Sequence, residues 1–159
     1  MLSPQEAEAR NTWFENHWRK HVPFNNLVGL EIIDWEKDLV RARLPFQERL
    51  SAHDGIFHGG VLATAIDTIG MGAVVAGHDF NLGSRFTTVS ITIQYMAVAP
   101  YEDVLIEGGC TKRGRRLNFA RGTVLTAAGK LLAEGVLTVS ASGERPRIGQ
   151  PETSHSESS

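Results

Sequence analysis

The sequence of 159 residues has a single cysteine, Cys110, and no cysteine–histidine cluster with the spacing of a zinc site. An internal disulfide is therefore excluded. Basic residues are not in excess either, because 16 Lys and Arg stand against 18 Asp and Glu, for a formal net charge of −2. Without an overall basic field, the sequence does not favour binding to DNA or RNA.

The chain also has no unambiguous membrane-spanning or export segment. It does not begin with a positively charged stretch followed by an apolar run, so we expect no signal peptide. The longest apolar segment, residues 59–77, is made largely of Gly, Ala and Thr and carries Asp67 near its middle. These features favour a buried core helix over a membrane span, and we expect a soluble, cytoplasmic protein.

The length fits one domain with additional segments at its ends. Ser3, Pro4 and Glu6 form a capping-box pattern, which predicts a helix over residues 4–20 whose aromatic side docks onto the domain. We expect this helix and a linker in residues 1–26 and the folded domain in residues 27–142. Residues 143–159 are rich in Ser, Glu and Pro, which predicts a disordered tail.

Antiparallel strands are predicted on both sides of the apolar segment, over residues 30–35, 39–44, 85–96, 104–110, 117–127 and 131–140. Residues 46–57 have no clear period and are predicted to be a loop. Strand 85–96 alternates between an apolar set, Val89, Ile91, Ile93 and Tyr95, and a polar set, Thr88, Ser90, Thr92 and Gln94. We expect the apolar set to face the helix.

The apolar segment itself predicts one long helix. Its larger apolar side chains recur at helical spacing, at Leu62, Ala65, Ile66, Ile69 and Ala73. Because nearly the whole circumference is small or apolar, the helix must be surrounded, and an antiparallel sheet wrapped around it achieves this. The fold class is therefore α+β, with a long central helix and an additional N-terminal helix.

Asp67 is the single ionisable residue of this helix and lies on a different face, together with Gly60, Ala63, Thr64, Gly70, Met71 and Val74. A lone carboxylate on a face of small residues is a candidate catalytic group, although it can also hold a neighbouring loop. His58-Gly59-Gly60 stands where the helix begins. The free N–H groups at that end can stabilise an oxyanion, whereas the simpler interpretation is a tight turn.

These motifs together resemble the hotdog-fold acyl-CoA thioesterases of the phenylacetate-pathway (PaaI-like) group. The likeness rests on His58-Gly59-Gly60 followed by Asp67, on segment 88–96 (TVSITIQYM) and on segment 112–117 (KRGRRL), and it runs over residues 27–139. In that family the sheet wraps the long helix and two chains pair edge to edge. The dimers commonly form homotetramers with active sites at subunit interfaces.

The resemblance implies a role for each residue of the motif. Asp67 attacks the thioester or activates water, and the Gly59 N–H polarises the thioester carbonyl. His58 holds the loop or helps to position the carbonyl. Thr88 corresponds to the Ser or Thr that orients the attacking water from the partner chain.

One position departs from the family pattern. Many relatives carry Asn or Gln six residues before the histidine of the motif, whereas this chain has Ala52, followed by His53. Either His53 takes the orienting role, or Asp67 and Thr88 act without it, or the protein is a slow or inactive enzyme.

The basic segment 112–116 is the densest group of cations, and the family places the phosphates of CoA near this turn. We expect CoA contacts from Arg113, Gly114, Arg115 and Arg116, although a solvated turn is the simpler alternative. The expected function is hydrolysis of an acyl- or aryl-CoA thioester by a homo-oligomer, without a metal or redox cofactor. A hotdog enoyl-CoA hydratase or dehydratase and a non-enzymatic acyl-CoA binder are the alternatives.

Overall fold

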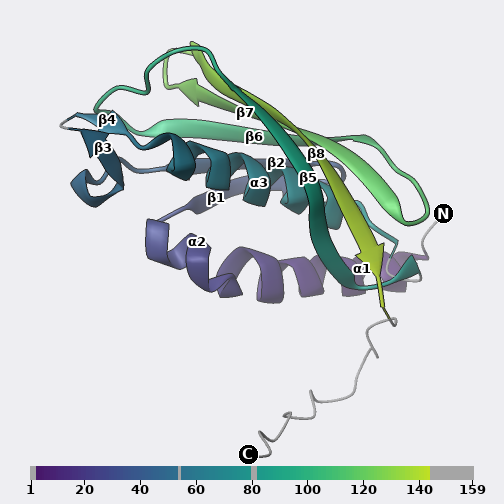
Figure 1. Ribbon diagram of the computed structural model, residues 1–159. Helices are drawn as coiled ribbons and strands as arrows, with labels where there is room; N and C mark the ends of the chain where they lie inside the picture. Colours follow the sequence, from purple (N-terminus) through teal and green to yellow (C-terminus); the bar gives the residue numbers. More distant parts are fainter. Residues whose placement is uncertain (1–2, 54, 80–81, 144–159) are drawn as a thin grey trace, which may run out of the picture.

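A six-stranded antiparallel sheet wraps around one long helix in the computed structural model, which describes residues 3–53, 55–79 and 82–143 (Figure 1). The strands of this sheet are β1 (Glu31–Glu36), β2 (Leu39–Leu44), β5 (Arg85–Tyr95), β6 (Val104–Lys112), β7 (Leu117–Thr126) and β8 (Leu131–Ser142). They lie in the order β1-β2-β6-β7-β8-β5. The predicted hotdog arrangement is confirmed, and β5 forms one edge of the sheet. The predicted disordered tail lies outside the described residues from position 144 onward.

The central helix, α3 (Gly59–Ala76), is the core element of the domain. All five side chains that were predicted to face the sheet are buried, and they are Leu62, Ala65, Ile66, Ile69 and Ala73. Small residues let the helix backbone lie close to the strands: a Cβ at Gly108 on β6 would lie 2.6 Å from the carbonyl carbon of Ile69. By length and composition α3 could span a membrane, but more than half of it is buried inside this domain.

The prediction for the N-terminal helix is largely confirmed. The segment consists of α1 (Pro4–Trp13), a π-helical turn η1 (Phe14–Arg19) and a short helix α2 (Pro23–Val28). Ser3 and Glu6 form the predicted capping box. Phe14 is fully buried and stacks on Trp35 of β1, with ring centroids 4.2 Å apart, so the aromatic side does dock onto the domain.

Two predictions about irregular segments are wrong. The expected linker before residue 27 is partly helical, because Pro23 occupies the first turn of α2, which ends at Gly29 in the left-handed conformation (φ 74°). Residues 46–57 were predicted to be a loop, but they form η2 (Glu48–Leu50) and a small hairpin of β3 (Ser51–His53) and β4 (Ile56–Phe57). This hairpin directly precedes the start of α3.

Candidate active site

Asp67 lies half-buried near the middle of α3 and is hydrogen-bonded to β5. Its Oδ1 accepts a hydrogen bond of 2.7 Å from the Oγ1–H of Thr88. Within the part of the chain that the structure describes, its Oδ2 has no hydrogen-bond donor. The carboxylate is therefore oriented through one oxygen while the other can take a proton or attack an electrophile.

Thr88 reaches Asp67 because β5 contains a β-bulge. The pairing of β5 with β8 shifts between Thr88 and Ser90, so Val89 is an extra residue. Beyond the bulge, Ile91 pairs with Leu137, whose side chain packs against α3. Thr88 and Ile91 therefore share the helix-facing side, and the prediction that placed them on opposite faces is wrong. Thr88 also binds the Asp67 of its own chain, whereas the resemblance implied that it acts from a neighbouring chain.

The helix-facing side of β5 is only partly covered by α3. Val89 is 58% exposed and Tyr95 is 53% exposed, so the expectation that the whole apolar set packs against the helix is not met. Gly70, expected on the open face with Asp67, is instead buried where a Cβ would lie 2.7 Å from Cδ1 of Leu137. Its small size serves the packing of the sheet.

The first turn of α3 presents a free backbone donor. His58 is the N-cap, and its Nδ1 accepts a hydrogen bond of 2.8 Å from the Gly60 N–H. The His58 carbonyl accepts the Val61 N–H at 2.9 Å. No acceptor for the Gly59 N–H is found among the described residues, so this group can bind an oxyanion at the positive end of the helix dipole.

His58 thus has a structural task that the sequence only suggested. A Cβ at Gly60 would lie 2.9 Å from His58 Nδ1, so the glycine makes room for this cap. Because Nδ1 accepts a hydrogen bond, it carries no proton in this arrangement. The structure shows His58 as the cap of the helix, and its expected roles in holding the loop or positioning the carbonyl stay predictions.

Tyr95 contacts the first turn of α3, and sequence reasoning missed this contact. It was assigned only to the apolar face of its strand, but its hydroxyl donates a hydrogen bond of 2.9 Å to the Gly59 carbonyl. Only the pairing of strand and helix in three dimensions brings the two residues together, since they are 36 positions apart in the chain.

Gly59 and Asp67 are separated along α3. They are eight residues apart, which corresponds to about 12 Å along the helix axis. One thioester carbonyl cannot contact both groups of the same chain, because reacting atoms must approach to about 3–3.5 Å. Each chain therefore carries two separate halves of the expected site.

His53 lies at the end of β3, where it pairs with Ile56 of β4, and its exposed side chain makes no hydrogen bond among the described residues. Ala52 precedes it and is exposed as well. The β3–β4 hairpin leads into the N-terminal end of α3, the Gly59 end, and not to Asp67 (Figure 1).

The basic turn is divided between an internal and an external part. The Arg113 guanidinium forms an ion pair with Asp38 and donates to the carbonyls of Ala73 and Val74, at the C-terminal end of α3. The side chain of Arg113 is therefore occupied by contacts within the fold. A Cβ at Gly114 would meet the Leu117 carbonyl, so this glycine also serves the turn.

Arg115 and Arg116 are exposed, and neither side chain has a hydrogen bond or ion pair within the described residues. Like the exposed Lys112, they are available cations of the basic segment, which lies at the opposite end of α3 from Gly59 (Figure 1).

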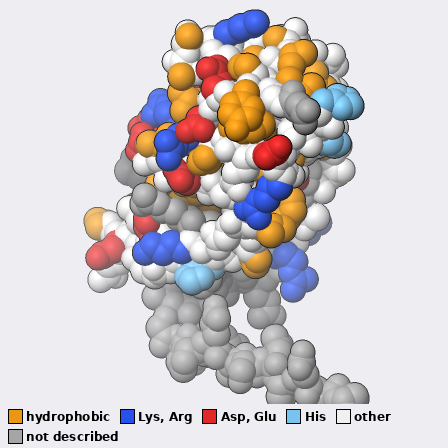
Figure 2. All heavy atoms as spheres, turned by 90° about the vertical axis from the view of Figure 1, so that its left-hand side faces the viewer, with side chains coloured by type: hydrophobic (Ala, Val, Ile, Leu, Met, Phe, Trp, Pro, Cys, Tyr) orange, Lys and Arg blue, Asp and Glu red, His pale blue; other side chains and the backbone are white. Residues whose placement is uncertain are grey.

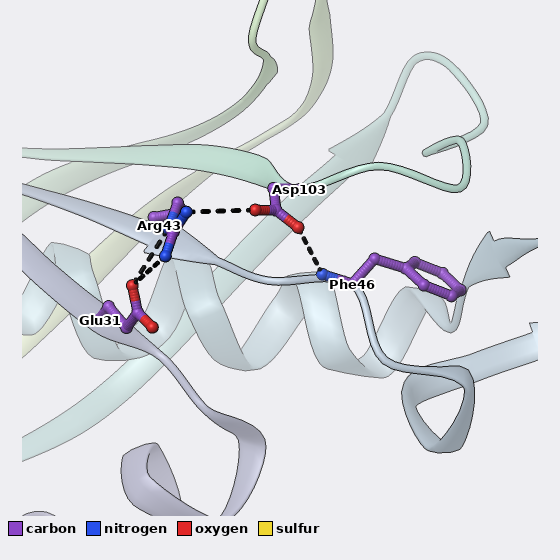
Figure 3. A network of polar contacts seen from close by, with 4 residues as sticks. All are labelled: Glu31, Arg43, Phe46 and Asp103. Atoms are coloured by element: carbon purple, nitrogen blue, oxygen red, sulfur yellow. Dashed lines mark hydrogen bonds and ion pairs between the residues drawn. The ribbon is translucent and has the colours of Figure 1, made fainter.

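A polar network anchors the segment that precedes α3 (Figure 3). Arg43 forms ion pairs with Glu31 at 2.7 Å and with Asp103 at 3.4 Å, and its hydrogen bond to Glu31 raises the pKa of the guanidinium. Asp103 also accepts the Phe46 N–H at 2.9 Å. The Phe46 ring packs against Phe57, which directly precedes the N-cap of α3.

Among the described residues at the Gly59 end of the molecule, side chains of both charges are mixed on the surface (Figure 2). Figure 2 shows it with Lys and Arg interspersed with Asp and Glu, and with hydrophobic side chains between them. Among the described residues, no three His, Cys, Asp or Glu side chains lie together as possible metal ligands.

Comparisons with known proteins agree with this geometry. The family model described as the thioesterase superfamily matches residues 54–133. The medium/long-chain acyl-CoA thioesterase YigI of Escherichia coli is 24% identical over 114 residues, covering 64% of this chain and 74% of that protein.

Solved structures have the same fold. A Shewanella oneidensis protein related to the thioesterase superfamily matches with a TM-score of 0.75 and 24% identity, over 89% of this chain and 100% of that one. A Streptococcus mutans protein bound to acetyl CoA matches with a TM-score of 0.69 and 23% identity, over 82% and 99%. A hotdog domain with a carboxylate on its central helix is thus established. The chain belongs to the thioesterase superfamily.

Proposed function

We propose that this protein hydrolyses an acyl- or aryl-CoA thioester to the free acid and CoA. The observation that carries the proposal is the Asp67 carboxylate, held by Thr88 and open at its second oxygen, on the central helix of a thioesterase-superfamily fold. Asp67 acts as nucleophile or general base, and the Gly59 N–H stabilises the oxyanion. Thr88 orients the carboxylate.

Coenzyme A esters are the proposed substrates because similar proteins hydrolyse or bind them. YigI is a medium/long-chain acyl-CoA thioesterase, and the Streptococcus mutans neighbour binds acetyl CoA. The PaaI-like resemblance of the motif adds aromatic acyl groups to the candidates. Arg115 and Arg116 are the proposed contacts to the CoA phosphates, because Arg113 is engaged inside the fold.

The complete site in this proposal is shared between two copies of the chain. Because Gly59 and Asp67 of one chain are about 12 Å apart along α3, a carbonyl bound to Gly59 of one copy is attacked with the help of Asp67 from another. Edge strand β5 supports such pairing, since it is long, unpaired on one side within the chain, and exposes Val89 and Tyr95. Dimers of this kind can assemble further into a homotetramer.

The proposed location is the cytoplasm. Cys110, the single cysteine of the chain, is a free thiol, which agrees with a reducing compartment.

A non-enzymatic acyl-CoA binder is the second candidate, and one observation favours it. Ala52 offers no amide where many relatives carry Asn or Gln, and His53 makes no hydrogen bond that would substitute for it. A binder retains acyl-CoA without releasing CoA, which separates the two functions in one assay.

The test is a thiol-release screen over short, long and aromatic acyl-CoA esters with the parent protein and Asp67→Asn. Asn keeps the shape and the Thr88 hydrogen bond but cannot accept a proton, so kcat should fall by roughly a thousandfold. Asp34→Asn removes one negative charge from an exposed side chain of β1, remote from α3 in its contacts, and should retain the parental rate. The thiol of Cys110 should add little background signal to the thiol-release assay, because burial raises its pKa and keeps it in the less reactive protonated form.

Either of two results would count against the proposal. If Asp67→Asn turns over the best substrate as fast as the parent, Asp67 is not the reacting carboxylate. If the parent binds every ester without releasing CoA, the protein is a binder.

A further inference from the structure

The peptide group between Gly59 and Gly60 is held from both sides by side chains. Its carbonyl accepts the Tyr95 hydroxyl at 2.9 Å, and its N–H donates to Nδ1 of His58 at 2.8 Å. Tyr95 comes from β5 and His58 from the N-cap of α3. This peptide directly follows the Gly59 N–H, the free donor of the site.

Such bracing has a physical reason at this position. Helix ends fray, and glycine is about 1 kcal/mol less favourable in a helix than alanine. A helix that begins with two glycines therefore has a poorly determined first turn. A carbonyl oxygen has two lone pairs, so Tyr95 can bind the Gly59 carbonyl in addition to any helical hydrogen bond there.

Tyr95 is itself firmly placed. It pairs with Ala133 on β8, within the regular part of the sheet beyond the bulge. Its ring lies against the helix start, where a Cβ on Gly59 would be 3.5 Å from ring carbon Cε1. Water could satisfy the carbonyl in its absence, but water cannot fix the direction of the peptide relative to the sheet.

We propose that Tyr95 is a positioning residue for the oxyanion donor, acting with the His58 cap to aim the Gly59 N–H at the thioester. The inference rests on the proposed function and deepens it. An oxyanion donor is effective only when it is fixed in advance toward the place where negative charge develops. Tyr95 provides that fixation by tying the first turn of α3 to β5.

The test compares Tyr95→Phe with the matched control Tyr101→Phe. Both variants lose one hydroxyl and keep the ring, but the Tyr101 hydroxyl makes no hydrogen bond among the described residues and the side chain is 69% exposed. Steady-state kinetics on the best acyl-CoA should show kcat of Tyr95→Phe reduced by roughly tenfold, since misdirecting a donor costs less than removing it. KM should stay within about twofold, because ground-state binding is unaffected. Tyr101→Phe should match the parent.

A second readout does not depend on activity. Hydrogen bonds in a chain polarise one another, so loss of the Tyr95 hydrogen bond should shift the amide resonance of Gly60 and speed its hydrogen exchange. Tyr101→Phe should leave this resonance in place. Asp67→Asn should remove turnover with the Gly60 resonance unchanged, which distinguishes a lost reacting group from a misdirected donor.

The proposal is overturned if Tyr95→Phe keeps the kcat of Tyr101→Phe, or if only KM changes, which would indicate a substrate contact. It is also overturned if the Gly60 resonance and exchange rate are the same in both variants. If the parent hydrolyses no thioester, the proposed function fails, and the Gly60 resonance alone decides whether Tyr95 fixes this peptide.

Discussion

Gly59 combines two related properties at the residue scale: its N–H has no acceptor among the described residues, and its position tolerates proline. It is the first residue of α3, where proline is favoured because that N–H has no helical partner. His58 before it has φ −64° and ψ 133°, the extended conformation that a residue preceding proline requires. The donor can therefore be deleted without breaking the helix.

We predict that Gly59→Pro lowers kcat by about a hundredfold or more, the effect of removing one oxyanion donor. Gly59→Ala is its partner variant, since it keeps the N–H and its Cβ makes only ordinary contact with Tyr95 at 3.5 Å. Thiol-release kinetics should show at least tenfold more activity in Gly59→Ala than in Gly59→Pro. Equal activity in the two variants would remove Gly59 from the mechanism.

At the scale of elements, the basic turn between β6 and β7 closes the far end of α3. Arg113 donates to the Ala73 and Val74 carbonyls, which belong to the last helical turn and have no helical donors of their own. Its cation also complements the negative end of the helix dipole. Asp38, in the β1–β2 turn, completes the ion pair.

We predict that Arg113→Met lowers the free energy of unfolding by about 2–4 kcal/mol, because the carbonyls of two buried residues and the half-buried Asp38 lose their donor. Arg115→Met removes the same charge from an exposed side chain and should change the stability by less than about 0.5 kcal/mol. Urea unfolding at one protein concentration measures both. Similar midpoints in the two variants would show that Arg113 does not support α3.

The elements that were predicted correctly are those whose own side chains decide them. The apolar period of α3, the Ser3–Glu6 capping box and the strand over residues 39–44 were predicted from local patterns, and the structure has all three. Burial of the predicted face of α3 follows from the same period.

The features that were missed depend on contacts between distant segments. The bulge at Val89 exists only in the pairing of β5 with β8, and it alone turns Thr88 toward Asp67. Arg113 looked like a solvent-exposed or CoA-binding cation because its partners, at Asp38 and at the end of α3, lie 75 and 39 residues away. Of the candidate site, Asp67 and Gly59 could be proposed from local chemistry, whereas the contact of Tyr95 with Gly59 could not.

At the scale of the whole molecule, the proposed site requires more than one chain. Gly59 and Asp67 stand on one rigid helix, so no movement within the chain brings them together. A symmetric dimer solves this, because each copy supplies Gly59 to one site and Asp67 to the other.

We predict that mixing two inactive variants restores activity. When Gly59→Pro and Asp67→Asn chains are produced together in equal amounts, about a quarter of the shared sites combine an intact Gly59 with an intact Asp67. Thiol release should therefore recover to about a quarter of the parental rate, while each variant alone stays inactive. Absence of any recovery in verified mixed oligomers would place the whole site in one chain.

The position of α3 in the chain also governs how the protein must be made. A helix apolar enough to pass for a membrane span is synthesised before β6, β7 and β8, the strands that enclose it. Until residues up to Ser142 have left the ribosome, its apolar surface has no complete cover, and exposed surface of this kind promotes aggregation. The core therefore closes only after β8 has emerged, and the nascent chain has to be protected until then.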